Sequence, residues 1–207
     1  MEVLETVVQR DSCLSRWWSN YLSTPPQGLP DEIRLPEATL SAVLDGYRVE
    51  ARYDLLAGER GGRWLIVDWK TGQRRSPRKW LSERLQTRIY PWVLVNAGAT
   101  LNGNDPIASG QVEMLYWFAE FPLQPERFGY SAQKLAEDGV FIEGLIREIK
   151  GRSEDVFPLT ENERLCRYCV YRSLCREDVQ AGPLDGWETE EVAETGLEDM
   201  DLEHIAP

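Results

Sequence analysis

The chain has 207 residues, 42% of them hydrophobic and 10% aromatic, which is typical of a globular protein with one sizeable core. No apolar run approaches the roughly 18 residues of a transmembrane helix, and residues 1–12 are acidic where a secretory signal begins with basic residues, so we expect a cytoplasmic protein with no membrane partner. The formal net charge of -12 argues against a nucleic-acid partner.

That charge is unevenly distributed along the chain. Nine acidic residues lie after Leu184 with no Lys or Arg among them, and removing these nine charges leaves -3 for residues 1–184. A basic stretch, QRRSPRK, occupies residues 73–79. The overall charge therefore does not exclude a polyanion bound at one face.

The first half of the chain predicts one helix followed by an antiparallel meander. Residues 5–22 (ETVVQRDSCLSRWWSNYL) predict a helix with an aromatic face. Residues 37–44 and 47–57 predict strands around Asp45-Gly46, a strong signal for a two-residue hairpin turn. A second turn at residues 58–62 leads into a strand at residues 63–70.

The second half predicts a helix, a strand and a long helix. Residues 80–96 predict a helix that Pro91 kinks or divides and that Gly98 ends. A strand at residues 111–119 and an amphipathic helix at residues 131–150 follow. The order α-β-β-β-α-β-α predicts an α/β or α+β domain with one mixed sheet.

Residues 64–73 (WLIVDWKTGQ) place a carboxylate and an amine at the end of an apolar strand. Alternation sends Asp68 and Lys70 to one face. Asp54 on the preceding strand is expected beside Asp68, and two neighbouring carboxylates repel each other unless a cation such as Mg²⁺ lies between them. Lys70 is then placed to orient or deprotonate a water, or to neutralise charge on an attacked phosphate. The alternative is a solvated ion pair at a strand end.

The next predicted helix adds Gln86 and Tyr90, which are four residues apart and share a face. An amide and a phenol can bond a backbone group, a phosphate or a metal-bound water.

Three motifs in order, Asp54, then Asp68-Trp69-Lys70, then Gln86-Thr87-Arg88-Ile89-Tyr90, make the chain resemble the PD-(D/E)XK nuclease superfamily in its RecB-like branch, over roughly residues 35–180. The resemblance implies a restriction-endonuclease-like core with a central mixed sheet flanked by helices. It also implies that Asp54 and Asp68 hold Mg²⁺ or Mn²⁺, that Lys70 acts on the nucleophilic water, and that Gln86 and Tyr90 support the site and the DNA backbone.

The same resemblance implies a substrate and a setting. The expected activity is metal-dependent DNA hydrolysis of the exonuclease type, on single strands or ends, in repair, recombination or CRISPR adaptation, with a protein partner in such a complex.

One departure from the family supports a second reading. The family carries a His on an upstream helix as a further metal ligand, and this chain has no His before His204. Glu50 shares a strand face with Asp54 and is a candidate substitute. The second reading is a weak or inactive nuclease-fold module that grips DNA or a partner.

Three of the four cysteines crowd into ten residues, Cys166-x₂-Cys169-x₅-Cys175. In a chain without an export signal this spacing favours a metal or cluster over disulfides. Three thiolates need a fourth ligand for a zinc site or a 4Fe-4S cluster, and Cys13 and His204 are the candidates. The resemblance implies an iron–sulfur cluster with one cysteine before the core and three after it. The alternative is three free thiols in a small apolar knot.

Together these patterns predict four segments: an N-terminal helix and linker at residues 1–34, a nuclease-like core at residues 35–160, a Cys-rich segment at residues 161–180, and an acidic, disordered tail at residues 181–207. A third reading is a cluster-bearing scaffold whose acidic tail meets a basic partner.

Overall fold

The computed structural model describes residues 11–152, 166, 169 and 171–175. The chain divides into two units, one of residues 1–71 and 78–151 and the other of residues 72–77 and 152–207. The predicted tail at residues 181–207 and most of the predicted Cys-rich segment lie outside the described residues.

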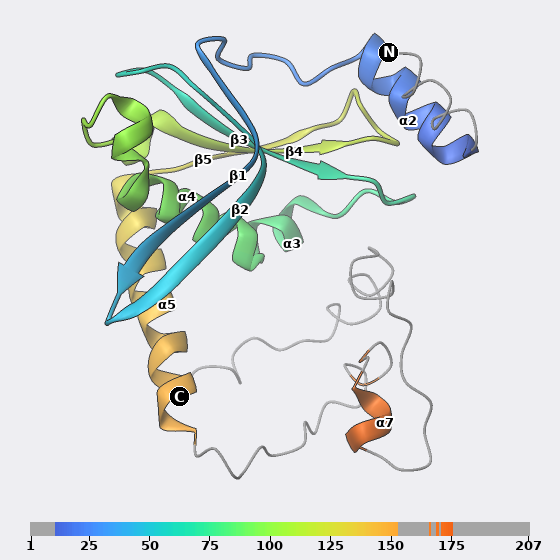
Figure 1. The fold of residues 1–207 in the computed structure, drawn as a ribbon. Helices are drawn as coiled ribbons and strands as arrows, with labels where there is room; N and C mark the ends of the chain where they lie inside the picture. Colours follow the sequence, from blue (N-terminus) through green and yellow to red (C-terminus); the bar gives the residue numbers. More distant parts are fainter. Residues whose placement is uncertain (1–10, 153–165, 167–168, 170, 176–207) are drawn as a thin grey trace. The chain divides into compact units, whose positions relative to one another are not determined.

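The first unit is built on a five-stranded mixed sheet flanked by helices, drawn in Figure 1. The strand order is β1-β2-β3-β4-β5, with β3 and β4 parallel and the other neighbours antiparallel. This is the predicted restriction-endonuclease-like α+β architecture. The elements of both units are α2 (Ser12–Ser23), β1 (Ile33–Leu44), β2 (Tyr47–Gly58), β3 (Trp64–Lys70), α3 (Arg78–Glu83), α4 (Leu85–Ala97), η1 (Gly98–Asn102), η2 (Ser109–Gln111), β4 (Val112–Phe118), β5 (Glu126–Gly129), α5 (Ala132–Gly151) and α7 (Arg172–Cys175).

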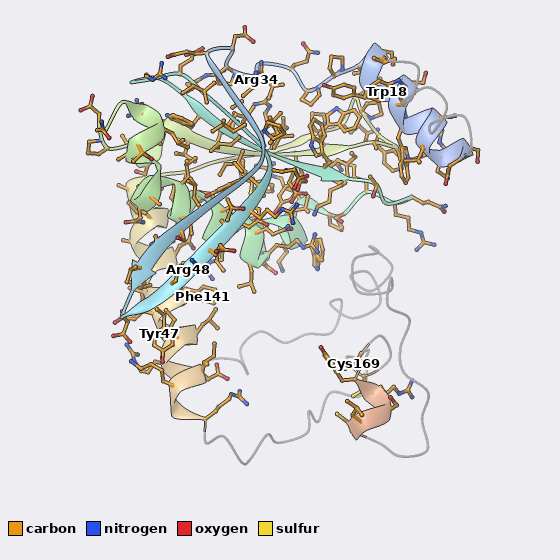
Figure 2. All side chains as sticks on the ribbon, viewed as in Figure 1. Trp18, Arg34, Tyr47, Arg48, Phe141 and Cys169 are labelled. Atoms are coloured by element: carbon orange, nitrogen blue, oxygen red, sulfur yellow. The ribbon has the colours of Figure 1, made fainter. Side chains whose placement is uncertain are left out.

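The predicted hairpin between β1 and β2 is confirmed. Leu44 pairs with Tyr47, and Asp45 and Gly46 both have positive φ angles, 49° and 79°. A type I′ turn needs positive φ at both central residues, which Asp-Gly supplies at low steric cost. Figure 2 labels Tyr47 at the start of β2, and Lys150 of α5 reaches this turn with its Nζ 2.9 Å from Asp45 Oδ2.

In both strands of this hairpin, the alternation of core-facing and outward-facing side chains is interrupted at the same level. The pairing runs from Pro36–Leu55 to Ala38–Tyr53, so Glu37 and Asp54 face each other at the step between. Glu37 has a φ of 52°, a left-handed conformation that is strained for a residue with a Cβ. Tyr53 and Leu56 both belong to the larger core cluster, whereas alternation alone would send them to opposite faces.

The two faces of the sheet have separate cores. The larger one joins Trp64, Ile66 and Met114 of the sheet to α4 and α5, and these helices lie against that face in Figure 1. The smaller one joins Leu65 and Val67 to Trp17 of α2 and to Leu29. Because β3 and β4 are parallel, their connection needs a crossover, and α3 and α4 form it.

Several element boundaries differ from the sequence prediction. The first helix begins at Ser12, where the Asp11 carboxylate accepts hydrogen bonds from the amides of Cys13 (2.7 Å) and Leu14 (3.1 Å). Residues 5–10 of that prediction lie outside the described residues. The first strand starts at Ile33, ahead of the predicted residue 37, and β5 was not predicted.

The predicted helix at residues 80–96 is two helices, and Pro91 is not where they divide. The break falls at Arg84, whose ψ of 143° is extended, while Pro91 lies inside α4. None of the helices described in the structure is long and apolar enough to cross a membrane.

Candidate active site

β3 carries Asp68 and Lys70 on the face of the sheet that α4 covers. Trp64 and Ile66 belong to the core on that side, so alternation brings Asp68 and Lys70 to the same side. Lys70 Nζ lies 2.8 Å from Asp68 Oδ2, and the two side chains are 16% and 5% exposed. The pair is therefore not the solvated ion pair that the sequence also allowed.

Lys70 connects β3 to α4. Its Nζ donates a hydrogen bond to Gln86 Oε1 at 3.3 Å and lies 5.2 Å from the centre of the Tyr116 ring on β4. The Tyr116 hydroxyl lies 2.6 Å from Thr87 Oγ1, one residue beyond Gln86. Gln86 is thus held beside Lys70 by its helix and by the neighbouring strand.

Asp54 lies on β2 beside this pair. The β2–β3 register ends at Leu55–Val67, and one further step along it sets Asp54 opposite Asp68. Asp54 Oδ2 accepts a hydrogen bond from the backbone amide of Trp69 at 2.8 Å. Opposite Glu37 the regular alternation of β2 side chains is interrupted, so that Tyr53 and Leu56 both face the larger core. The Asp54 side chain between them is thereby free to reach across to β3.

The electrostatics of the site centre on Asp68. Burial raises the pKa of its carboxyl group, and the neighbouring Asp54 charge acts in the same direction. Lys70 and, more weakly, Arg84 oppose the rise. Burial therefore outweighs the nearby cations, so the site favours additional positive charge.

Tyr90 lies on the same face of α4 as Gln86. Burial raises the pKa of its phenol, a hydrogen bond with Gln86 lowers it, and the charges of Asp68 and Asp54 raise it further. Its backbone carbonyl accepts a hydrogen bond from the Tyr53 hydroxyl at 3.0 Å. All five residues predicted for the site, Asp54, Asp68, Lys70, Gln86 and Tyr90, are therefore brought together.

Asp54 and Asp68 fit a hard divalent cation. Asp68 Oδ2 is buried and lies 2.8 Å from the Lys70 ammonium. Asp54 Oδ2 accepts the Trp69 amide, and within the described part of the chain no hydrogen bond uses the other Asp54 oxygen. Among residues 11–152, 166, 169 and 171–175, no group of three or more His, Cys, Asp and Glu could hold a metal. A cation here therefore has two protein carboxylates, and Mg²⁺ is commonly bound by one or two carboxylates with water and phosphate oxygens.

Glu50 is not a third carboxylate of this site. It pairs with Ser41 of β1, and its Oε2 lies 2.9 Å from Arg48 Nη2 on the exposed part of the hairpin. Regular alternation along the strand would place Glu50 and Asp54 on one face, but the alternation is interrupted at Asp54 and the two side chains are separated.

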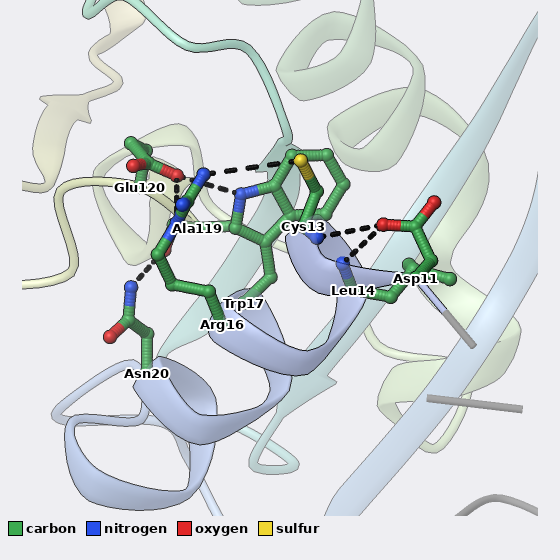
Figure 3. Close-up of polar contacts among 8 residues, drawn as sticks. All are labelled: Asp11, Cys13, Leu14, Arg16, Trp17, Asn20, Ala119 and Glu120. Carbon is green, nitrogen blue, oxygen red and sulfur yellow. Dashed lines mark hydrogen bonds and ion pairs between the residues drawn. The ribbon is translucent and has the colours of Figure 1, made fainter. Parts of the chain in front are cut away.

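The four cysteines fall in different units. Cys13 lies on α2, which docks beyond the end of β4. Trp17 Nε1 donates a hydrogen bond to Glu120 Oε2 at 3.0 Å, and Asn20 Nδ2 donates one to the Ala119 carbonyl at 2.7 Å. Figure 3 draws both contacts as dashed lines. In the other unit, the Cys169 amide donates to the Cys166 carbonyl at 3.3 Å. No disulfide joins the four cysteines, and the described part of the chain contains no cysteine ligand group. The cluster stays a prediction, and His204 lies outside the described residues.

Sequence reasoning missed the contacts of two arginines around the start of α4. Arg84 lies over the Trp80 ring, 4.0 Å from its centre. Arg88 Nε lies 2.6 Å from Asp138 Oδ1 on α5. Neither had a sequence signal, because both appear as ordinary positions within one predicted helix.

Comparison with known proteins gives one family model and a match to a solved structure. The family model of the PD-(D/E)XK nuclease superfamily matches residues 10–176. No curated protein matches. Among solved structures, the crystal structure of SSO0001 is 15% identical over 84% of this chain and 75% of its own, with a TM-score of 0.43.

Proposed function

Because the chain belongs to the PD-(D/E)XK nuclease superfamily, we propose that it is a metal-dependent nuclease that hydrolyses phosphodiester bonds in DNA. The finer proposal is an exonuclease of the RecB-like branch that acts on single strands or ends, in repair, recombination or CRISPR adaptation. Metal-dependent nuclease activity is general in this superfamily, whereas the branch, the exonuclease mode and the pathway are inferred from the motifs alone.

One observation carries the proposal: the ion pair between buried Asp68 and half-buried Lys70 at 2.8 Å, which a hydrogen bond of 3.3 Å extends to half-buried Gln86. Burying a carboxylate and an ammonium together costs desolvation energy, which a strand with a purely structural role would avoid with apolar side chains. Perturbed ionisable groups gathered in this way are typical of functional sites.

The roles follow from what each side chain can do. Bound Mg²⁺ or Mn²⁺ supplies a Lewis acid and lowers the pKa of a bound water. Asp54 and Asp68 offer it carboxylate oxygens. Lys70 donates hydrogen bonds to the attacking water or to a phosphate oxygen, and its charge offsets the negative charge that develops on the phosphate. Gln86 holds Lys70 through Oε1, and Tyr90 positions Gln86.

The test is degradation of end-labelled single-stranded and duplex DNA, in EDTA and after Mg²⁺ or Mn²⁺ is added back. Wild type is compared with Lys70→Ala and with Lys134→Ala, which changes an exposed lysine of α5 whose Nζ donates to the Gly129 carbonyl at 3.1 Å. We expect cleavage to require metal, to survive in Lys134→Ala and to be lost in Lys70→Ala. Cleavage that persists in Lys70→Ala contradicts the assigned role.

A second candidate function is a DNA- or partner-binding module without catalysis. It is favoured by the two-carboxylate site, since the described residues offer no third metal ligand. DNA binding without metal-dependent cleavage, from folded wild-type protein, would replace the first proposal with this one.

The cysteines carry a separate proposal. Cys166, Cys169 and Cys175, with Cys13 as fourth ligand, bind a 4Fe-4S cluster or Zn²⁺ that has a structural role. Protein purified without oxygen is analysed for iron, zinc and visible absorption. Absence of both metals, or equal metal content in Cys169→Ser, contradicts this proposal.

A further inference from the structure

Arg84 lies at the break between α3 and α4. Among the residues that the structure describes, the one side chain that its guanidinium contacts is an aromatic ring. The guanidinium of Arg84 lies 4.0 Å from the centre of the Trp80 ring, and Trp80 packs against the core. Stacking on an aromatic face fixes the plane of a guanidinium and leaves its N–H groups pointing outward in that plane.

Other arginines of the first unit that are half-buried or packed on a ring have carboxylate partners. Arg88 pairs with Asp138 at 2.6 Å, Arg127 with Glu113 at 2.7 Å, and Arg78 with Glu126. Arg84 therefore differs from these arginines, because no carboxylate among the described residues pairs with it. A structural arginine would be expected to satisfy its donors within the protein.

The position of Arg84 relates it to the candidate site. It immediately precedes α4, and its carbonyl accepts the amide of Thr87 at 3.0 Å in the first turn. The same turn carries Gln86, whose Oε1 is 3.3 Å from Lys70 Nζ. Arg84 thus lies at the N-terminal end of α4, two residues before a side chain of the candidate site.

We propose that Arg84, held on Trp80, binds a backbone phosphate of the nucleic acid that the candidate site acts on. A guanidinium fork matches two oxygens of a phosphate and binds them more strongly than neutral donors do. Among the residues that the structure describes, no carboxylate forms an ion pair with Arg84, so we assign the acceptor to the substrate. The inference rests on the proposed function and adds a residue that contacts the substrate.

The test measures binding without cleavage. Fluorescence anisotropy of a fluorescein-labelled single-stranded oligonucleotide is recorded in EDTA over a range of salt concentrations. The proteins are wild type, Arg84→Ala, Arg84→Lys and the control Arg48→Ala, an exposed arginine of the hairpin that pairs with Glu50 and is labelled in Figure 2.

Loss of one charged hydrogen-bonded contact predicts a Kd raised about tenfold in Arg84→Ala. The slope of log Kd against log salt concentration should fall by about 0.7, the value for one phosphate contact on a single strand. Arg84→Lys should keep the slope and bind with intermediate affinity, because it keeps the charge and loses the fork. Arg48→Ala should match wild type.

Unchanged affinity and salt slope in Arg84→Ala, with wild type binding DNA, overturns this proposal and leaves the proposed nuclease function standing. Failure of wild type to bind any single-stranded or duplex DNA overturns both. If Arg84→Ala does not fold, an unaltered Kd in Arg84→Lys overturns the proposal.

Discussion

The ion pair that fixes α4 against α5 gives the sharpest stability prediction. Asp138 is 6% exposed. It accepts hydrogen bonds from Arg88 Nε at 2.6 Å and from the Tyr130 hydroxyl at 3.1 Å. The Arg88 guanidinium also lies 3.6 Å from the centre of the Phe141 ring, which Figure 2 labels on α5. Asp138→Ala removes the carboxylate that accepts both hydrogen bonds and leaves the buried Tyr130 hydroxyl and the half-buried Arg88 guanidinium without this partner.

Breaking a buried ion pair by removing one partner costs about 3–5 kcal/mol. The Arg88 side chain is 28% exposed, so water partly solvates it and the low end applies. We expect Asp138→Ala to lower the free energy of unfolding by about 3 kcal/mol, measured by urea denaturation followed by tryptophan fluorescence. Asp138→Asn keeps the shape and one acceptor and should lose less.

The matched control lies on the same helix. Glu143 Oε1 is 3.7 Å from Arg147 Nη2, and both side chains are exposed. Glu143→Ala should change stability by no more than about 0.5 kcal/mol. A loss below about 1 kcal/mol in Asp138→Ala, or one equal to that of the control, would refute the reasoning that this buried pair locks the two helices together.

Three further predictions follow from the site and the hairpin. Burial raises the pKa of Asp68 in the folded protein. The Asp68 carboxyl group therefore adds to the free energy of unfolding below its unfolded pKa of about 4, and this contribution is lost as pH rises through the folded pKa. Asp68→Asn should therefore gain in urea midpoint over wild type as pH rises, and a constant difference contradicts this. Because Glu37 has a φ of 52°, the Glu37→Gly variant should be more stable than the Glu37→Ala variant by about 1 kcal/mol in the same assay. This is the reverse of the usual order of these two substitutions in a strand. Mn²⁺ at ten times its Kd should stabilise wild type by about 1.4 kcal/mol in a thermal melt, and an equal shift in Asp54→Asn would contradict the assigned ligand.

The parts of the fold that were predicted correctly depend on local chemistry. Asp45-Gly46 determines its own turn, since both residues tolerate positive φ. The apolar run before Asp68 fixes a strand whose alternation decides which side Lys70 faces. The site residues were proposed from the resemblance to the nuclease superfamily and from the spacing within β3 and within α4, which decides which of them share a face.

The parts that were missed depend on distant contacts. The helix break at Arg84 is held by Thr87, whose side chain bonds the Leu81 carbonyl and the Tyr116 hydroxyl of β4. No local pattern within residues 80–96 predicts that contact. Pro91, in contrast, is a strong local signal for a helix break, yet it is accommodated inside α4. The interrupted alternation at Asp54 likewise needs the facing Glu37 of the other strand.

The strand β5 escaped prediction for a related reason. It has four residues, ERFG, with no apolar period. Its charged side chains are satisfied by Arg78 and Glu113 from elsewhere in the fold.

The central claim is that Lys70 and the two carboxylates form a working metal-dependent nuclease site. The most direct measurement is the cleavage rate of labelled DNA with saturating Mn²⁺ under single-turnover conditions, for wild type, Lys70→Ala and Lys134→Ala at equal occupancy of bound DNA. The account predicts a rate reduced by about 10²–10⁴-fold in Lys70→Ala and unchanged in Lys134→Ala. A rate in Lys70→Ala within about threefold of wild type, well below that range, would contradict it.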